Sequence, residues 1–370
     1  MGTKPRKKRM TVKRWISVKL GDIKEYILYK NSADVAHFCP VLGYLVLLYM
    51  LFFQLHGFIP DNWESTKMYI PPTPVPQEDI GNMEDLKDGI TFVTAYFDLG
   101  TFKKGSMVFK YFGKHTYMNW MAAYSKFNNS VIFFTDSSDM EDLFRDIRKQ
   151  FPSHMTRVIR IEQDKLWSFR LAPQIKQIYL QPGYPKYPPN TVKEKYPCAM
   201  HVKYEALEMV IRQKLYDTKH LAWIDIGYFR DKETKTFTLE TPDDFKDDHI
   251  AFMQIDKFYE GLLSRDVIWN NMVWIAGGMF LGRPDYLLTF IADYKRAVES
   301  LIAEKLMSTD QQILYIMYSK QTHIGARVPI QVYYHKCRCD WFFLGTLCRY
   351  VWEKKHWYRP RLGYFLSLAL

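Results

Sequence analysis

The sequence lacks the short motifs that identify the commonest α/β enzymes. No G-x-G-x-x-G follows the first predicted strand, where Asp98-Leu99-Gly100 stands instead, and no G-x-x-x-x-G-K-[ST] occurs. These absences argue against a Rossmann dinucleotide site and against the usual P-loop. No G-x-S-x-G occurs either, so the common hydrolase plan lacks its nucleophile. No unit of about 20–50 residues recurs, which excludes a solenoid.

Cysteine is also scarce, with five in 370 residues. Cys39 lies in an apolar run. The other four allow three disulfide pairings, among which the sequence does not choose: Cys198, Cys337, Cys339 and Cys348. Cys337-x-Cys339 next to His335 also suggests zinc, but this spacing matches no common zinc module.

Charge is absent from residues 35–60, and within them Phe38–Leu55 is apolar apart from Gln54. A helix over residues 38–55 rises about 27 Å, which is close to the thickness of the hydrocarbon core of a bilayer. A buried core helix is the alternative, but such a helix is rarely apolar all round for this length. The pattern therefore predicts one transmembrane helix in residues 35–60, which anchors the protein in a lipid bilayer.

Positive charge is concentrated before that helix. The net charge is +11, and residues 1–34 hold ten Lys and Arg against three acidic residues. This flank predicts a cytoplasmic tail over 1–34, and a signal-anchor that leaves the remainder luminal. A cleaved signal peptide would need an A-x-A-like site after the apolar core, and none follows. Because the excess charge lies on a tail rather than on a folded domain, we expect no nucleic-acid partner.

The luminal part begins with a proline-rich stalk over residues 61–88. Such a plan is typical of type II membrane proteins of the Golgi apparatus or endoplasmic reticulum. The sequon Asn128-Asn129-Ser130 predicts a glycan on Asn128 if that residue is exposed.

From residue 89 onward, short β-rich apolar runs alternate with helical patterns. Strands are predicted over 90–96, 131–134, 157–162, 221–226 and 275–281. Helices are predicted over 118–127 and 140–151, in the region 204–215, and from Pro284 onward. This alternation predicts one α/β domain over 89–340, with a mostly parallel sheet flanked by helices. The aromatic and basic tail, residues 341–370, either packs on the domain or contacts a membrane surface.

Ligands of such sheets bind beyond the carboxyl ends of the strands, and three acidic signals stand at predicted strand or helix ends. Asp136 begins a run to Asp139 that also suits a turn and a helix N-cap. Asp310 lies in a segment where Ser308 and Gln311 also fit a capping box. Asp225 stands in an apolar stretch, where a carboxylate is costly to bury unless it is paired or bound to a cation. Asp225 is therefore the strongest candidate.

Four segments resemble the HtrL/YibB family: Thr91–Gly100, Trp223–Arg230, Ala276–Gly282 and Asp310–Leu314. The resemblance spans residues 89–335. Bacterial members of that family are associated with lipopolysaccharide core assembly, and membrane-anchored animal members exist. The resemblance implies a glycosyltransferase-A-like fold.

Sites of that fold hold a divalent cation against a nucleotide diphosphate with an Asp-x-Asp motif. The matching stretch here is Asp225-Ile226-Gly227, which keeps one carboxylate. The resemblance implies that Asp225 binds Mn²⁺ or Mg²⁺, or the ribose, with a further metal ligand from His335 or His323.

The resemblance also implies a set of roles around the nucleotide-sugar. Asp136 would meet the base or ribose, Lys203 and Arg230 the diphosphate, and Gly277 and Gly278 a closely approaching sugar, with Gln311 in the same site. Asp310 would accept the proton of an acceptor hydroxyl in an inverting transfer, or orient the acceptor in a retaining one.

The predicted function is that of a type II membrane glycosyltransferase, which moves a sugar from a nucleotide-sugar to a glycan or glycolipid acceptor in the secretory pathway. The alternative is a catalytically degenerate, carbohydrate-binding relative of the same fold, which the missing second aspartate favours. An adhesion or scaffold protein would show β-sandwich patterning and a regular cysteine framework, and the sequence has neither.

Overall fold

The structure is a computed structural model of the chain, and it describes residues 67–69, 87–104, 111–230, 235–320, 324–335 and 340–356. These residues all belong to one compact unit, Trp63–Leu370. The predicted tail 1–34, the predicted transmembrane segment 35–60 and most of the predicted stalk lie outside the described residues. Within the described ranges, no helix has both the length and the apolar character that a membrane span requires.

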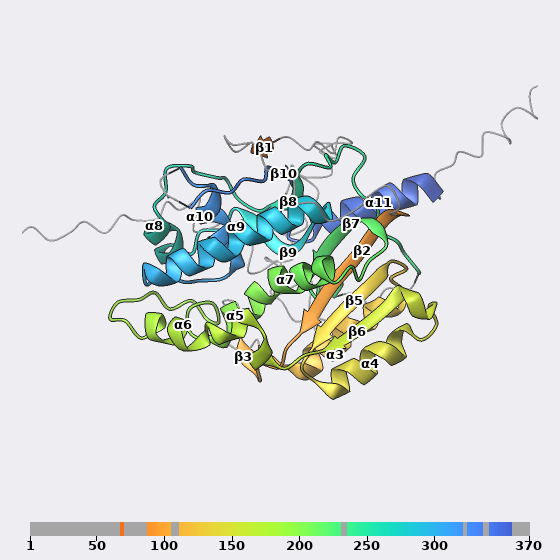
Figure 1. Cartoon of the computed structure of the whole chain (residues 1–370), viewed down its shortest axis with the longest axis horizontal. Coiled ribbons are helices and arrows are strands. Elements are labelled where there is room, and N and C mark those ends of the chain that lie inside the picture. The colour runs from red at the N-terminus through yellow and green to blue at the C-terminus, as the bar shows by residue number, and fades with distance from the viewer. Residues whose placement is uncertain are drawn as a thin grey trace, which may run out of the picture. The chain divides into compact units, whose positions relative to one another are not determined.

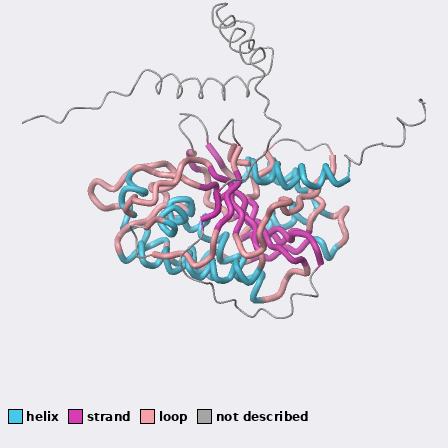
Figure 2. The backbone as a smooth tube through the Cα atoms, turned by 90° about the horizontal axis from the view of Figure 1, so that it is seen from above, coloured by secondary structure: helices cyan, strands magenta, loops and turns pink. Residues whose placement is uncertain are grey.

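An eight-stranded sheet runs through the middle of the described region, in the order β1-β10-β8-β9-β7-β2-β5-β6, and Figure 2 shows its strands between the helices. Parallel pairing joins β10 to β8, β7 to β2, β2 to β5 and β5 to β6. β9 is antiparallel to both of its neighbours, β7 and β8, and β1 is antiparallel to β10. The expected mostly parallel sheet is confirmed. Its strands are β1 Lys67–Tyr69, β2 Lys87–Tyr96, β5 Ser130–Thr135, β6 Thr156–Arg160, β7 Thr218–Ile224, β8 Ile250–Gln254, β9 Ile275–Gly282 and β10 Ile330–Tyr333; β3 Phe102–Lys103 and β4 Tyr111–Phe112 form a separate small sheet.

Helices cover both faces of the sheet (Figure 1). Helices α7, α9 and α10 pack with one apolar cluster, and α4 and α11 pack with another on the opposite face. The helices are α3 Lys114–Met121, α4 Ser138–Arg148, α5 Trp167–Arg170, α6 Ala172–Tyr179, α7 Lys195–Arg212, α8 Ser264–Trp269, α9 Pro284–Ala303, α10 Asp310–Tyr318 and α11 Phe343–His356.

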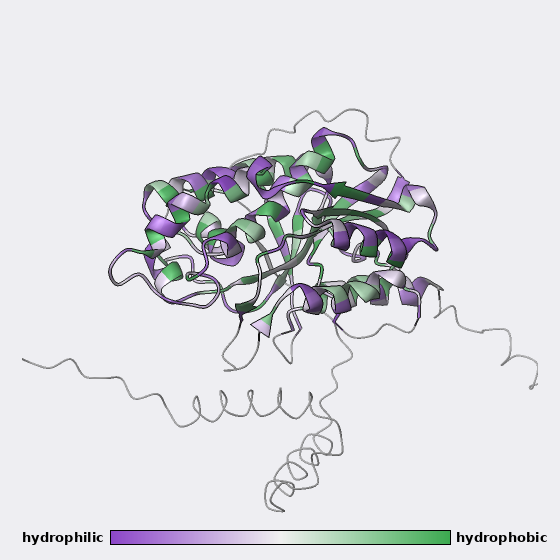
Figure 3. Cartoon of the chain, turned by 90° about the horizontal axis from the view of Figure 1, so that it is seen from below, coloured by the Kyte–Doolittle hydropathy of each residue, from purple (hydrophilic) through white to green (hydrophobic). Residues whose placement is uncertain are grey.

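The central strand β2 shows why the sequence forms this layered core. A parallel strand that is covered on both faces reads as a nearly continuous apolar run, as residues 90–96 do with Thr91 and Thr94 as the two polar positions. Successive side chains point to opposite faces, so Phe92 joins one cluster and Val93 the other. Both side chains are fully buried. Figure 3 shows the same division, with hydrophobic strands inside and hydrophilic positions along the helices that face outward.

Several predicted boundaries differ from the structure. The helix expected over 118–127 is α3, which begins earlier at Lys114, followed by a 3₁₀ turn, Ala122–Ser125. The strand expected over 221–226 ends at Ile224, so Asp225 follows the strand. The prediction did not include β8 and β10. Helix α11 packs its buried residues Leu344 and Cys348 against the sheet, so the folded region continues past residue 340.

Candidate functional site

Four elements bring charged side chains together where β7 ends. Asp225 follows β7, and its backbone N–H donates to the carbonyl of Gly278 in β9 at 2.8 Å. Lys203 reaches the same place from the middle of α7, and Asp310 is the first residue of α10. Because β9 runs antiparallel to β7, its first residues lie beside the last residues of β7. The carboxyl edge of the sheet thus carries the site, as expected for an α/β fold.

Lys203 lies at the centre of this cluster, with its side chain 2% exposed. Its Nζ lies 2.9 Å from Oδ2 of Asp310 and 3.1 Å from Oδ1 of Asp225, and it donates to the carbonyl of Gly277 at 2.7 Å. An ammonium group has three N–H donors, so these three acceptors satisfy it completely. Lys203 therefore ties α7, β7, β9 and α10 together.

The two buried members of the cluster influence each other's charge. Burial by itself disfavours the ammonium, but Asp225 and Asp310 outweigh it and raise the pKa of Lys203 above its ordinary value. Burial raises the pKa of the Asp310 carboxyl, and the neighbouring ammonium opposes that rise. Lys203 is therefore a charged side chain held in the interior by carboxylates.

Gly277 leaves the space that Asp310 occupies. A Cβ at Gly277 would lie 2.1 Å from Oδ2 of Asp310 and 3.3 Å from Nζ of Lys203. At Gly278 a Cβ would meet only ordinary contacts, at 3.5 Å from Tyr228 and 3.7 Å from Oδ2 of Asp225. The first glycine thus makes room for the ion pair, whereas the second borders the exposed face of Asp225.

Asp225 is the accessible carboxylate of the cluster, with its side chain 41% exposed. Its Oδ1 accepts a hydrogen bond from Nε1 of Trp223 at 2.8 Å, in addition to its contact with Lys203. Its Oδ2 receives no hydrogen bond from the described residues. The protein therefore holds Oδ1, whereas Oδ2 belongs to the partly exposed side of the carboxylate.

An aromatic wall stands beside Asp225. The indole of Trp120 packs on Gly227, where a Cβ would lie 2.3 Å from the ring. The exposed guanidinium of Arg230 lies over the Trp120 ring at 4.8 Å and over the Phe342 ring at 5.0 Å, and its Nε donates to the carbonyl of Gly227 at 3.1 Å. These contacts hold Arg230 beside the site, and no hydrogen bond from its terminal nitrogens to another described residue accompanies them.

A further lysine, Lys104, interacts electrostatically with the cluster; burial lowers the pKa of its ammonium, and Tyr117 and Asp225 oppose that lowering. Its electrostatic neighbours include Asp225, Lys203 and Arg230, and its Nζ lies 5.6 Å from the centre of the Tyr196 ring. The sequence gives no indication of Lys104, because this residue follows a short strand in a loop that matches no motif. The sequence does not indicate Trp120 either, because a tryptophan on a short helix is most simply interpreted as a residue of the hydrophobic core.

Residues 88–348 of this chain match a family described as a bacterial protein of unknown function, HtrL_YibB. The chain belongs to the HtrL/YibB family. Protein HtrL of Escherichia coli K12 is 25% identical over 261 residues, which cover 64% of this chain and 86% of that protein. The structure of mouse xyloside xylosyltransferase 1 aligns with a TM-score of 0.32 and 8% identity over 62% of this chain and 81% of that one, a similarity too low to support an argument.

Three of the four segments that resemble the HtrL/YibB family meet at this site. Trp223–Arg230 supplies Asp225 and Arg230, Ala276–Gly282 supplies the two glycines, and Asp310–Leu314 supplies the buried carboxylate. The fourth segment, Thr91–Gly100, contains the end of β2 and the loop that follows. Site residues that are distant in the sequence are thus adjacent in the fold.

Asp136 lies at the end of β5, at the same edge, but its carboxylate binds protein groups. It accepts the backbone N–H of Asp98 at 3.0 Å and Nε2 of Gln163 at 2.6 Å. The following turn caps α4, because the Ser137 side chain accepts the N–H of Met140. The turn-and-cap interpretation of this stretch is confirmed, and the nucleotide contact of Asp136 stays a prediction.

The capping box expected from Ser308 and Gln311 is wrong. The N-cap of α10 is Thr309, and the hydroxyls of Ser308 and Thr309 both donate to Oε1 of Gln312, at 3.1 Å and 2.7 Å. Gln311 is half-buried, and its contact with a nucleotide-sugar stays a prediction. Asp310 lies in the first turn of the helix as expected, but only 2% of it is exposed.

Of the predicted metal ligands, the described part of the chain includes Asp225 and His335, and their binding of a metal ion stays a prediction. His335 packs edge-on against Phe343 at 5.5 Å, and His323 lies outside the described residues. No group of three or more His, Cys, Asp or Glu side chains suited to a metal occurs among the residues described. Cys198 and Cys348 are free and buried, and Cys337 and Cys339 lie outside the described ranges.

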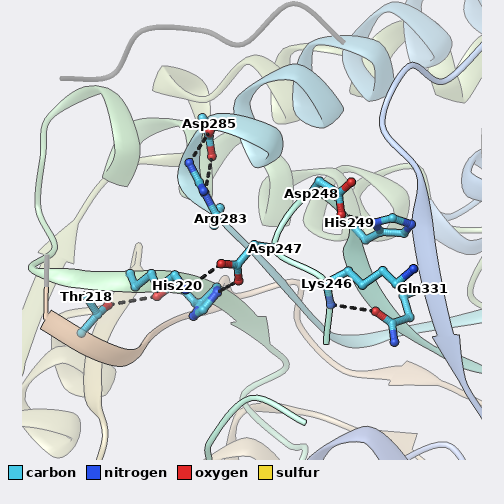
Figure 4. A network of polar contacts seen from close by, with 10 residues as sticks. Thr218, His220, Lys246, Asp247, Asp248, His249, Arg283, Asp285 and Gln331 are labelled. Atoms are coloured by element: carbon cyan, nitrogen blue, oxygen red, sulfur yellow. Dashed lines mark hydrogen bonds and ion pairs between the residues drawn. The ribbon is translucent and has the colours of Figure 1, made fainter. Parts of the chain in front are cut away.

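The opposite edge of the sheet also carries charges, but they neutralise one another (Figure 4). His220 contacts Asp247 at 2.8 Å, and Arg283 binds the buried Asp285 at 2.9 Å. The backbone N–H of Lys246 donates to Gln331. Because these side chains bind one another across the ends of strands, this network stabilises the fold, and the candidate site is at the other edge.

Proposed function

We propose that this protein binds a nucleotide-sugar at the carboxyl edge of its sheet and transfers the sugar to a glycan or glycolipid acceptor. The observation that carries this proposal is the exposed carboxylate of Asp225 beside two exposed cations, Lys104 and Arg230. A nucleotide-sugar offers the complementary groups, since its diphosphate is anionic and its ribose and sugar carry hydroxyl donors.

The geometry supports a division of labour among these side chains. Oδ2 of Asp225 accepts a ribose or sugar hydroxyl, while Lys104 and Arg230 contact the diphosphate. Negative charge grows on the diphosphate as the bond to the sugar breaks, so fixed cations stabilise the transition state more than the ground state. The half-exposed face of Gly278 allows a sugar to approach Asp225.

The apolar segment 35–60 and the basic tail before it support an anchored, luminal placement in the Golgi apparatus or endoplasmic reticulum. In that compartment nucleotide-sugar donors meet glycan acceptors. We therefore include this placement in the proposal.

One observation favours the second candidate, a carbohydrate-binding relative without catalysis. Asp310, the predicted proton acceptor, is buried and paired with Lys203. A carboxylate in this position does not reach an acceptor hydroxyl unless α10 moves. In this case Asp310 positions Lys203, and the site binds its ligand without turning it over.

Calorimetry with the purified full-length protein tests the proposal against a panel of nucleoside diphosphates and their sugars. We expect one-to-one binding to at least one member, and Asp225→Asn should weaken that binding by about tenfold or more. Asp247→Asn is the matched control, because Asp247 lies at the opposite edge of the sheet. Release of free diphosphate in the presence of acceptor glycans would distinguish catalysis from binding, and absence of binding by the whole panel would contradict the proposal.

A further inference from the structure

The environment of Asp225 does not match a divalent cation. Oδ1 already contacts the ammonium of Lys203 and the indole N–H of Trp223, so a metal ion at this carboxylate could bind only Oδ2 and would lie close to that ammonium. The Lys203 ammonium also binds Asp310 and the carbonyl of Gly277. A positively charged group surrounded by two carboxylates and a carbonyl occupies the kind of oxygen cage that a hard metal ion prefers.

The structure also explains why position 227 holds no second carboxylate. A Cβ at Gly227 would lie 2.3 Å from Cε3 and 2.8 Å from Cζ3 of Trp120, so any side chain there would displace the indole. The guanidinium of Arg230 lies over the same Trp120 ring and over the Phe342 ring. The place of a second metal ligand is therefore filled by an indole that supports a guanidinium.

The charges of the cluster lead to the same conclusion. Lys104, Lys203 and Arg230 are three cations, and Asp225 and Asp310 are two carboxylates, so the group carries one net positive charge. Lys203 is neutralised by its two carboxylates, so the two exposed cations, Lys104 and Arg230, are the positive charges that face the two or more negative charges of a nucleoside diphosphate. A divalent cation would add two positive charges close to the Lys203 ammonium, which disfavours it.

We infer that this protein recognises a nucleoside diphosphate without a divalent cation. Lys203 takes the structural position of the metal and holds Asp225 in place. The side chains of Lys104 and Arg230 bind the diphosphate. Oδ2 of Asp225 accepts a hydrogen bond from a ligand hydroxyl. This inference rests on the proposed function, because it describes how the same site binds the same ligand.

The test measures binding of a nucleoside diphosphate to the full-length protein by calorimetry, first with EDTA and then with excess Mn²⁺. We use the member of the panel that binds best. The expected dissociation constants differ by less than about twofold between the two conditions. Lys104→Gln and Arg230→Gln should each weaken binding about tenfold or more in EDTA, because each removes a charge-assisted contact. Both side chains are exposed, so these variants should keep the fold.

Lys219→Gln is the matched control, because Lys219 pairs with Asp247 in the network at the opposite edge. It should leave binding unchanged. Binding that disappears in EDTA and returns with Mn²⁺ would overturn the inference and leave the proposed function intact. Failure of every nucleoside diphosphate to bind in either condition would overturn both.

Discussion

Burial of the Lys203 ammonium costs free energy, yet the contacts of this ammonium hold four elements of the fold together. A buried ammonium loses its hydration, and its attraction to carboxylates offsets that loss only when the geometry is good. Here three acceptors lie within 3.1 Å of Nζ. Removing one charge of such a group leaves the other without a partner, which typically costs about 3–5 kcal/mol. The cluster therefore specifies one arrangement of the surrounding elements.

Gly277→Ala should destabilise the protein by about 1–3 kcal/mol, because the new methyl group overlaps the carboxylate of Asp310. Gly278→Ala is the matched control, since its methyl group meets ordinary contacts. Urea unfolding followed by circular dichroism measures both. Equal urea midpoints for Gly277→Ala and Gly278→Ala would contradict this prediction, because they would show that the Lys203–Asp310 ion pair shifts without loss of stability.

The sequence indicated some of these residues more clearly than others. Asp225 stood out because a carboxylate next to apolar residues needs a partner, and the structure supplies Lys203. Lys203 was predicted to contact a diphosphate, whereas in the structure it binds Asp225, Asp310 and the Gly277 carbonyl. A helical sequence pattern cannot reveal these partners, because they come from three other elements. Lys104 had no signal at all, because its role arises from tertiary proximity.

At the level of elements, the reversed direction of β9 shapes the site. Its antiparallel pairing with β7 places Gly277 and Gly278 next to Asp225 instead of at the opposite edge. Alternating strands and helices predicted the layers and a mostly parallel sheet. They did not predict the direction of β9, because an apolar strand reads the same in either direction. The strands β8 and β10 were missed because long loops separate them from the elements that the pattern revealed.

Helix α11 should contribute to the stability of the sheet although it follows the predicted domain. Leu344→Ala removes a fully buried side chain from the cluster that α11 shares with the sheet, and it should cost about 2–5 kcal/mol. Thr346→Ala changes an exposed position of the same helix and serves as the control. Thermal unfolding compares the two variants with the parent protein. If Leu344→Ala unfolds at the temperature of the control, α11 does not hold the sheet in the way described.

The whole molecule offers a direct test of its predicted placement. Asn128 is exposed in the turn before β5, whereas the neighbouring Asn129 is buried. If the region beyond the apolar segment enters the lumen of the secretory pathway, Asn128 should carry a glycan. The full-length chain, expressed in animal cells, should then migrate faster after treatment with an N-glycosidase, and Asn128→Gln should abolish this shift. A chain of unchanged mobility would contradict the luminal orientation.

The ion pair between Lys203 and Asp310 joins positions that are 107 residues apart. During synthesis on a ribosome, α7 therefore emerges long before Asp310, the second of the two carboxylates that neutralise Lys203. Until then Lys203 lacks one of the two carboxylates that offset the burial of its charge, so α7 is held less firmly against the growing sheet. The final docking of this layer is thus postponed until α10 has been made, and nascent chains that stop short of it should be recognised by chaperones as incomplete.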